Sequence, residues 1–472
     1  MESQAEVIPT TQENNNNGDT TINNLPSSNP SSLPFYQISK RYTLAILSHI
    51  GLILTISIFS YYHKILDLNK YTDNDESMKF WYKMMYILVQ IPAAIFSYKY
   101  SATHLFGICI LGNSIVTFLF PIISKWNDPA LLIVTLFHGL FMGATFPSFY
   151  SIWRYWAPPS ERTTLVAIGY TGILSGRLIF NLISTCSFKL ENILHMYGLI
   201  GILWHFTWRR FAFEHPSQHP SIMEQELTYL QKTITITHEI PVPSIPWKKI
   251  LKNTPIATLI IVDYLYNLSI PLISVSMDKK QLLINNSVRL ISILVTSYAI
   301  DLLLQKTSIR KIILRKIHIS GGLITNVLLS WIAWILFLTF GIGYVDDLSP
   351  VWYNIASYLT TIVFYLPFIG LYVNYLEISG KYAGITIAMR NMMLMSNYLF
   401  MLLSDYMDFH IFRIIDNIFF RQFSYMFLFI CGALFYGIFG KSEQQDLDNA
   451  QGLRFNRFTY NPSPRDEDFN AQ

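Results

Sequence analysis

The sequence predicts an all-α membrane protein with about 12 transmembrane helices in two groups of six. Of its 472 residues, 51% are hydrophobic and 14% charged, whereas soluble domains carry about 25% charged residues. From Arg41 onwards, apolar runs near the bilayer-spanning length of about 20 residues follow one another in steady succession. A polar interval at 214–254 separates the sixth run from the seventh. This arrangement is typical of membrane proteins built from two related halves.

The apolar runs place the spans in order along the chain. The first six lie near 42–62, 80–98, 105–124, 129–153, 163–187 and 193–213. The second six lie near 255–276, 284–304, 319–341, 351–373, 383–403 and 422–440. These runs divide the chain into a disordered tail at 1–40, an N-terminal six-helix half at 41–213, a linker at 214–254, a C-terminal six-helix half at 255–440 and a second tail at 441–472.

Basic residues predict the orientation. The linker and its borders hold six of them: Arg209, Arg210, Lys232, Lys248, Lys249 and Lys252. Loops on the opposite side hold acids such as Asp73 and Asp346. By the positive-inside rule, the linker and both termini are cytoplasmic. The sequence does not distinguish the plasma membrane from a vesicular or lysosomal membrane.

A helical hairpin is predicted at Gly143–Thr171, which reads GATFPSFYSIWRYWAPPSERTTLVAIGYT. An apolar helix breaks at Pro158 and Pro159, because each proline lacks a backbone N–H and clashes with the preceding turn. A second apolar run follows at once. In the linker, Ser221 and Glu224 fit a capping box that opens a short helix through about Gln231.

Four segments resemble one family. The run TFPSFYSIWRYWAPPSERTTL is similar to the segment after the fourth membrane helix in the sialin, vesicular glutamate and sodium–phosphate transporter family, the anion–cation symporters of the major facilitator superfamily. HPSIMEQELTYL at 219–230, IPWKKILKNTP at 245–255 and VNYLEISGKYAGI at 373–385 resemble it too. The resemblance implies the major facilitator fold over roughly residues 40–440. It also implies a structural motif formed by Trp156, Pro158, Pro159, Glu161, Arg162 and Asp301, in which Asp301 pins the loop.

The charged positions of that family are not retained. Its members carry an arginine in helix one, an arginine and a glutamate in helix four, and an arginine in helix seven, which bind the anionic substrate and couple it to protons or sodium. Here these positions are Phe59, Thr135, Met142 and Tyr266. Met142 has no titratable group and carries no proton. The resemblance therefore implies the fold, while substrate and ion coupling are not carried over.

Ionisable residues inside the spans are the candidates for function, because each costs about 2.5–3.5 kcal/mol on insertion scales. Arg177, Arg289 and Arg390 are the candidate anion-binding arginines, and Tyr266 and Asn374 complete the predicted substrate-binding set. A buried arginine stays charged and needs a carboxylate, carbonyls, water or a bound anion. Asp263 is the acid at a similar depth, so it is either a structural ion-pair partner or a coupling residue.

Two functions fit these observations. The first is a secondary transporter that moves a small organic or inorganic anion by alternating access, with proton or sodium coupling left open. The second is a non-transporting relative that acts as a membrane sensor or interaction scaffold. No metal cluster, nucleophile motif or phosphate loop occurs, so we expect no enzyme and no cofactor. The expected partners are the anion and the lipid bilayer, and no nucleic acid. A channel is disfavoured because no filter-like segment occurs.

Overall fold

The computed structural model describes residues 39–67, 75–126, 128–234, 244–273, 279–340, 349–406 and 418–447. All regular secondary structure in these segments is helical. Most of the predicted tail at 1–40, the predicted tail beyond residue 447, and the loop acids Asp73 and Asp346 lie outside the described residues.

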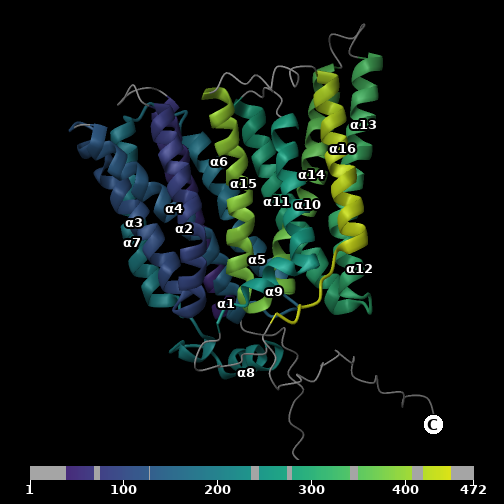
Figure 1. Cartoon of the computed structure of the whole chain (residues 1–472), viewed down its shortest axis with the longest axis horizontal. Coiled ribbons are helices and arrows are strands. Elements are labelled where there is room, and N and C mark those ends of the chain that lie inside the picture. Colours follow the sequence, from purple (N-terminus) through teal and green to yellow (C-terminus); the bar gives the residue numbers. More distant parts are fainter. Residues whose placement is uncertain are drawn as a thin grey trace, which may run out of the picture. The chain divides into compact units, whose positions relative to one another are not determined.

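The first helix group comprises α1 to α7: α1 (Lys40–Asp67), α2 (Asp75–Lys99), α3 (Ala102–Ile123), α4 (Asp128–Trp156), α5 (Arg162–Tyr170), α6 (Gly172–Ile183) and α7 (Leu190–Phe211). The linker contains α8 (Glu224–Thr233) and α9 (Trp247–Lys252). The second helix group comprises α10 to α16: α10 (Thr254–Ile273), α11 (Lys279–Lys306), α12 (Lys311–Lys316), α13 (Gly322–Phe340), α14 (Ser349–Ser379), α15 (Ala383–Tyr406) and α16 (Ile418–Phe439). In Figure 1 the long helices run side by side, and α8 lies crosswise beyond their ends.

Helices occupy all twelve predicted spans. Within the described residues, seven helical stretches are long and apolar enough to cross a membrane by length and composition, and one of them, Tyr358–Met395, runs through α14 and α15. Each helix group packs mainly within itself, through α2 on α4, α3 on α7 and α10 on α16. The two groups meet where α15 packs on α2 and α4, and where α11 packs on α5 and α6.

The fifth predicted span is shorter than predicted and is divided. Thr171 separates α5 from α6, and α6 ends at Ile183 rather than at residue 187. Two hydroxyl side chains explain this end: Ser184 donates to the carbonyl of Asn181 at 2.9 Å, and Thr185 donates to that of Leu182 at 2.7 Å. Such local bonds compete with continued helix.

The linker helix α8 begins at Glu224, with Met223 as its N-cap residue and no capping bond from a side chain. The predicted capping box at Ser221 is therefore wrong. An acid in the first turn, Glu226, instead accepts from the backbone amides of Lys40 at 2.9 Å and Arg41 at 3.2 Å. Glu226 thus caps α1 rather than its own helix, and α8 is tied to the first helix group.

Candidate functional site

A buried ion pair joins α10 to α15. Arg390 forms a bidentate ion pair with Asp263: Nε donates to Oδ2 at 2.5 Å and Nη2 donates to Oδ1 at 3.1 Å. The Asp263 side chain is fully buried, and that of Arg390 is 9% exposed. A two-pronged pair of this kind is the strong form of a charged hydrogen bond, and it neutralises both charges at a depth where either alone is costly.

Polar neighbours complete the hydrogen bonds of the Asp263–Arg390 pair. Arg390 donates from Nη1 to Oδ1 of Asn391 at 2.8 Å and from Nη2 to the hydroxyl of Tyr372, whose ring centroid lies 4.7 Å from the guanidinium carbon. Asn267, one turn beyond Asp263 on α10, donates from Nδ2 to Oδ1 of Asp263 at 2.6 Å. Three neighbouring side chains therefore hold one carboxylate and one guanidinium in a fixed geometry.

The same network reaches the first helix group. Asn391 donates from Nδ2 to Oε1 of Gln90 on α2 at 3.2 Å, and Gln90 donates from Nε2 to the carbonyl of Gly143 on α4 at 2.9 Å. The ring of Tyr372 stacks on that of Tyr150 of α4, with centroids 5.9 Å apart. The Asp263–Arg390 pair is therefore connected to both helix groups, where they meet.

Arg177 and Arg289 are not paired with an acid anywhere in the described residues. Arg177 on α6 is exposed and has no hydrogen-bond partner there. Arg289 on α11 donates from Nη1 to Oδ1 of Asn286 at 3.2 Å, and its guanidinium carbon lies 5.1 Å from the ring centroid of Tyr365. Its Nε is buried without a partner. No acid in the described segments balances the charge of either arginine, unlike that of Arg390.

Arg177 on α6 follows Tyr170, the last residue of α5, across the junction at Thr171, whose backbone is helical. Tyr170 lies seven residues, about two turns, before Arg177, so both occupy nearly the same face. The Tyr170 ring contacts Tyr372 at 4.6 Å and Phe368 at 5.4 Å between centroids, both on α14. The helices that carry Arg177 and Arg289, α6 and α11, pack against each other.

Tyr266 belongs to an aromatic cluster. Its ring stacks on Phe364 at 4.9 Å and on Phe429 at 5.7 Å between centroids. Its hydroxyl donates to the carbonyl of Phe364 at 2.9 Å, and the residue is 1% exposed. The position where the resembling family carries an arginine is therefore filled by a buried ring whose polar atom is satisfied by backbone.

Asn374 lies apart from the other predicted binding residues. It is fully buried, and its Nδ2 donates to the hydroxyl of Tyr436 on α16 and to the carbonyl of Lys441 at 2.9 Å. These bonds tie α14 to the chain just beyond α16. The structure thus does not bring Asn374 to the Asp263–Arg390 pair.

The three remaining family positions carry no charge and are packed in the first helix group. The Phe59 ring lies against His63 with centroids 4.3 Å apart, and Met142 is 5% exposed. Thr135 is hydrogen-bonded to the hydroxyl of Tyr62 at 2.5 Å. Aromatic and hydroxyl contacts therefore stand where the family places charged side chains.

The hairpin between α4 and α5 is anchored by its motif residues. Trp156 donates from Nε1 to the carbonyl of Phe213 at 3.0 Å, and Arg162 donates from Nε and Nη2 to the carbonyl of Ala157 at 3.2 Å. Pro158 and Pro159 lie in the turn between the helices. The arginine therefore binds the carbonyl of the residue that follows the last residue of α4.

Glu161 and Asp301 anchor this hairpin at its turn, where α5 begins. Glu161 accepts from Nε of Arg41 at 2.9 Å, and Arg41 also reaches Glu226 at 3.0 Å. Asp301 on α11 accepts from the backbone amides of Thr163 at 3.3 Å and Thr164 at 2.6 Å, at the first turn of α5. A carboxylate at a helix N-terminus is favourably placed.

One buried pair on this side was not predicted. Arg315 on α12 contacts Glu377 on α14 with two prongs, Nε to Oε2 at 2.9 Å and Nη2 to Oε1 at 3.0 Å, and both side chains are 1% exposed. Nη2 of Arg315 also donates to Thr163 at 3.0 Å. Glu377 lies inside the VNYLEIS segment, which signalled family likeness but no ion pair.

Curated relatives include vesicular glutamate transporter 1 of Xenopus tropicalis, which is 25% identical over 389 residues, 76% of this chain and 64% of that protein. The probable vesicular glutamate transporter eat-4 of Caenorhabditis elegans is 28% identical over 251 residues, 48% of this chain and 43% of that protein. The chain thus spans less than two thirds of the length of these relatives. They confirm the resemblance stated from the motifs, with low identity throughout.

Solved structures with the same fold include FucP in the outward conformation, with a TM-score of 0.57 and 11% identity, covering 85% of this chain and 100% of that chain. The proton:xylose symporter XylE, bound to a sugar derivative, has a TM-score of 0.55 and 12% identity, covering 84% and 94%. They confirm the predicted fold class. The family model for the Major Facilitator Superfamily matches residues 42–396, so this multi-pass integral membrane protein belongs to the major facilitator superfamily.

Proposed function

We propose that this chain is a secondary transporter that moves a small anion by alternating access. Membership of the major facilitator superfamily supports transport, and the relatives named as vesicular glutamate transporters support an anionic substrate. The observation that carries the proposal is the buried Asp263–Arg390 pair, which is hydrogen-bonded through Asn391 to Gln90 where the helix groups meet. A charge pair at this depth is expensive, and in transporters such groups mark substrate and ion pathways.

The first contacts of the anion are Arg177 and Arg289 in this proposal. Both lack an acidic partner among the described residues, and their helices pack against each other. At an effective dielectric of 20, a carboxylate 4 Å from one guanidinium gains about 4 kcal/mol. Tyr365, beside Arg289, offers an aromatic surface to the rest of the substrate. Tyr266 and Asn374 shape the site indirectly, because their polar atoms are engaged elsewhere.

Coupling follows from competition for Arg390. The substrate anion and Asp263 are both negative, and only one of them fully occupies the guanidinium fork. When Asp263 takes up a proton, its charge is lost, and the fork becomes free to bind the anion. Release of the anion and the proton then restores the pair. With Met142 at the helix-four position, Asp263 is the residue to which we assign proton coupling.

Alternating access requires the contacts on the α8 side to open. There Asp301 holds the first turn of α5, and Gln305 donates from Nε2 to the carbonyl of Ser160 at 2.9 Å. These bonds cross between the helix groups. A conformation open on the α8 side breaks them, while the Asp263–Arg390 pair decides when that conformation is reached.

Uptake by purified protein in proteoliposomes tests the proposal. Glutamate, other carboxylates and phosphate are offered with and without a pH gradient or sodium, and we expect saturable uptake of at least one anion. Because charged hydrogen bonds contribute about 1.5–3 kcal/mol, Arg177→Gln and Arg289→Gln each raise KM by about tenfold or more. Arg209→Gln, at an exposed arginine near the end of α7, is the matched control and leaves KM unchanged. If neither Arg177→Gln nor Arg289→Gln changes the KM of uptake, this assignment is wrong.

The second candidate is a non-transporting relative acting as a sensor or scaffold. Phe59, Thr135 and Met142 favour it, because the family's charged helix-one and helix-four positions are all neutral here. In that case the same liposomes bind an anion, detected as thermal stabilisation, but accumulate none under any gradient.

A further inference from the structure

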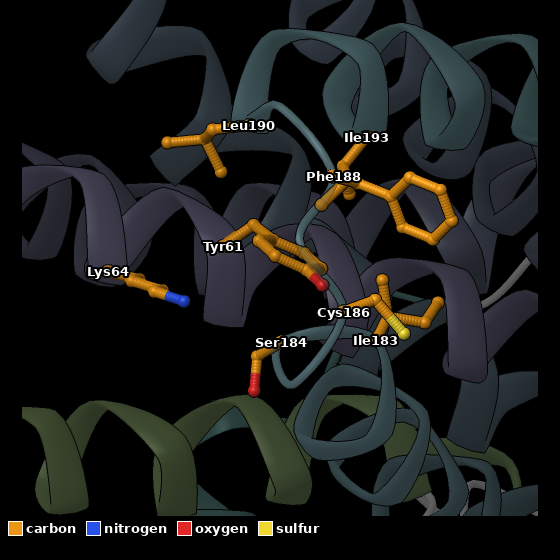
Figure 2. Close-up of a pocket in the computed structure, with 8 residues that line it drawn as sticks. All are labelled: Tyr61, Lys64, Ile183, Ser184, Cys186, Phe188, Leu190 and Ile193. Carbon is orange, nitrogen blue, oxygen red and sulfur yellow. The ribbon is translucent and has the colours of Figure 1, made fainter.

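A pocket lies at the end of α1, and neither Asp263 nor Arg390 lines it. It encloses about 200 Å³ between α1 and the turn from α6 to α7 (Figure 2). Tyr61 lies 21 residues, about 30 Å, along α1 from Lys40, whose amide is bound by α8, so the pocket is at the opposite end of α1 from the linker helix. Its lining residues are Tyr61, Lys64, Ile183, Ser184, Cys186, Phe188, Leu190 and Ile193.

Two hydrogen-bond donors in the pocket lack a protein partner among the described residues. The Tyr61 hydroxyl is buried and makes no hydrogen bond. Lys64 makes no ion pair there, and its ammonium lies 5.9 Å from the centroid of the Phe180 ring. Ser184 differs, because its hydroxyl already donates to the carbonyl of Asn181 at 2.9 Å. Figure 2 shows Lys64 extending towards the space beside the Tyr61 ring, with Ser184 on the other side of that space.

Among the described residues, the Tyr61 hydroxyl is a buried donor without an acceptor, which is costly, and the half-buried Lys64 ammonium makes no ion pair. Together these two donors attract an anion. A carboxylate has two acceptor oxygens, which match two donors. A phosphate monoester has three oxygens and more negative charge, so one oxygen would lack a donor. The pocket therefore matches a carboxylate better than a phosphate.

The rest of the wall selects an apolar body. Ile183, Leu190 and Ile193 contribute hydrocarbon, and Phe188 at the rim is 67% exposed. Leu182, in the last turn of α6 next to the lining, is 46% exposed. In a protein that spans a membrane, such apolar side chains face lipid. We propose that this pocket binds the carboxylate of a single-chain fatty acid that enters from the bilayer.

Cys186 supplies a direct readout, because it lines the pocket and is exposed. Cys109 is buried and inert to a water-soluble maleimide, and Cys431→Ser removes the partly exposed thiol. In the full chain carrying that substitution, decanoate is expected to slow the labelling of Cys186. Acetate lacks the alkyl chain, decanol lacks the carboxylate, and inorganic phosphate lacks both, so each of them leaves the labelling rate unchanged.

Lys64→Gln and Tyr61→Phe each raise the half-protective decanoate concentration about tenfold, because each removes a bond to a charged group. Lys64→Arg retains protection and shows that the charge matters. Lys189→Gln, at an exposed lysine of the same turn that does not line the pocket, is the matched control. Protection by decanol equal to that by decanoate, protection by phosphate alone, or protection that survives Lys64→Gln overturns the proposal. This site is independent of the transport proposal, so failure of one leaves the other standing.

Discussion

At the scale of single residues, pairing decides which buried charges are available to a ligand. Arg390 has its charge balanced by Asp263, whereas Arg177 and Arg289 have no acidic partner among the described residues. The depth of a residue within a span does not reveal this difference. Asp263 was the acid that sequence reasoning named for Arg390, because it was the one carboxylate at a similar depth.

Breaking the Asp263–Arg390 pair from one side should be costly. Arg390→Gln leaves a buried carboxylate without its partner, and such a loss destabilises by about 3–5 kcal/mol. Asp263→Asn together with Arg390→Gln removes both charges, so we expect the double variant to be more stable than Arg390→Gln alone. Thermal unfolding of purified protein in detergent measures both. Equal additive losses would show that the two residues are not energetically coupled.

At the scale of helices, glycine sets how closely α6 approaches α1. A Cβ atom on Gly172 would lie 2.3 Å from the carbonyl oxygen of His49, and one on Gly176 would lie 2.8 Å from that of Ile53. Backbone oxygens cannot rotate away as a side chain can. The spacing of these two glycines, four residues apart on one face of α6, therefore brings the backbones of α6 and α1 into close contact.

Gly172→Ala should accordingly force α6 away from α1. Overpacking of this kind costs about 1–3 kcal/mol. Gly437→Ala on α16 is the matched control, because its added Cβ meets nothing closer than 3.8 Å, and alanine favours helix over glycine. The melting temperature of Gly172→Ala should fall below the wild-type value, and that of Gly437→Ala should equal or exceed it. A Gly172→Ala protein as stable as Gly437→Ala contradicts the close approach.

Local pattern predicted the elements better than the contacts between them. Apolar runs predicted the positions of the long helices, and two prolines predicted the break between α4 and α5, because both signals are carried by adjacent residues. The pair of Arg315 with Glu377 and the bond from Arg41 to Glu226 were not anticipated. Their partners lie 62 and 185 residues apart, and no periodicity within a helix encodes such a contact.

At the scale of the whole molecule, the contacts of the linker show which helix ends lie on the side of the linker. Glu226 of α8 holds the start of α1, and Glu161 of the α4–α5 hairpin joins it through Arg41. These contacts place the basic linker and the α4–α5 hairpin at the same ends of the helices. The positive-inside rule predicts that this side is cytoplasmic.

The orientation gives a prediction for intact cells. Tags at both termini should be accessible only from the cytosol, and a tag in the loop between α1 and α2 only from the opposite side. Protease protection of sealed vesicles measures this. In sealed vesicles whose cytosolic face points outwards, external protease should remove both terminal tags. A terminal tag that survives this treatment would contradict the orientation.

The central claim is that Asp263 couples anion movement to protons by competing for Arg390. The most direct measurement compares two assays in the same proteoliposomes: uptake driven by an inward proton gradient, and counterflow exchange of the anion without any gradient. Asp263→Asn cannot ionise, so we expect gradient-driven accumulation to be lost while counterflow persists. Accumulation driven by the proton gradient that survives Asp263→Asn at the wild-type level would contradict the account.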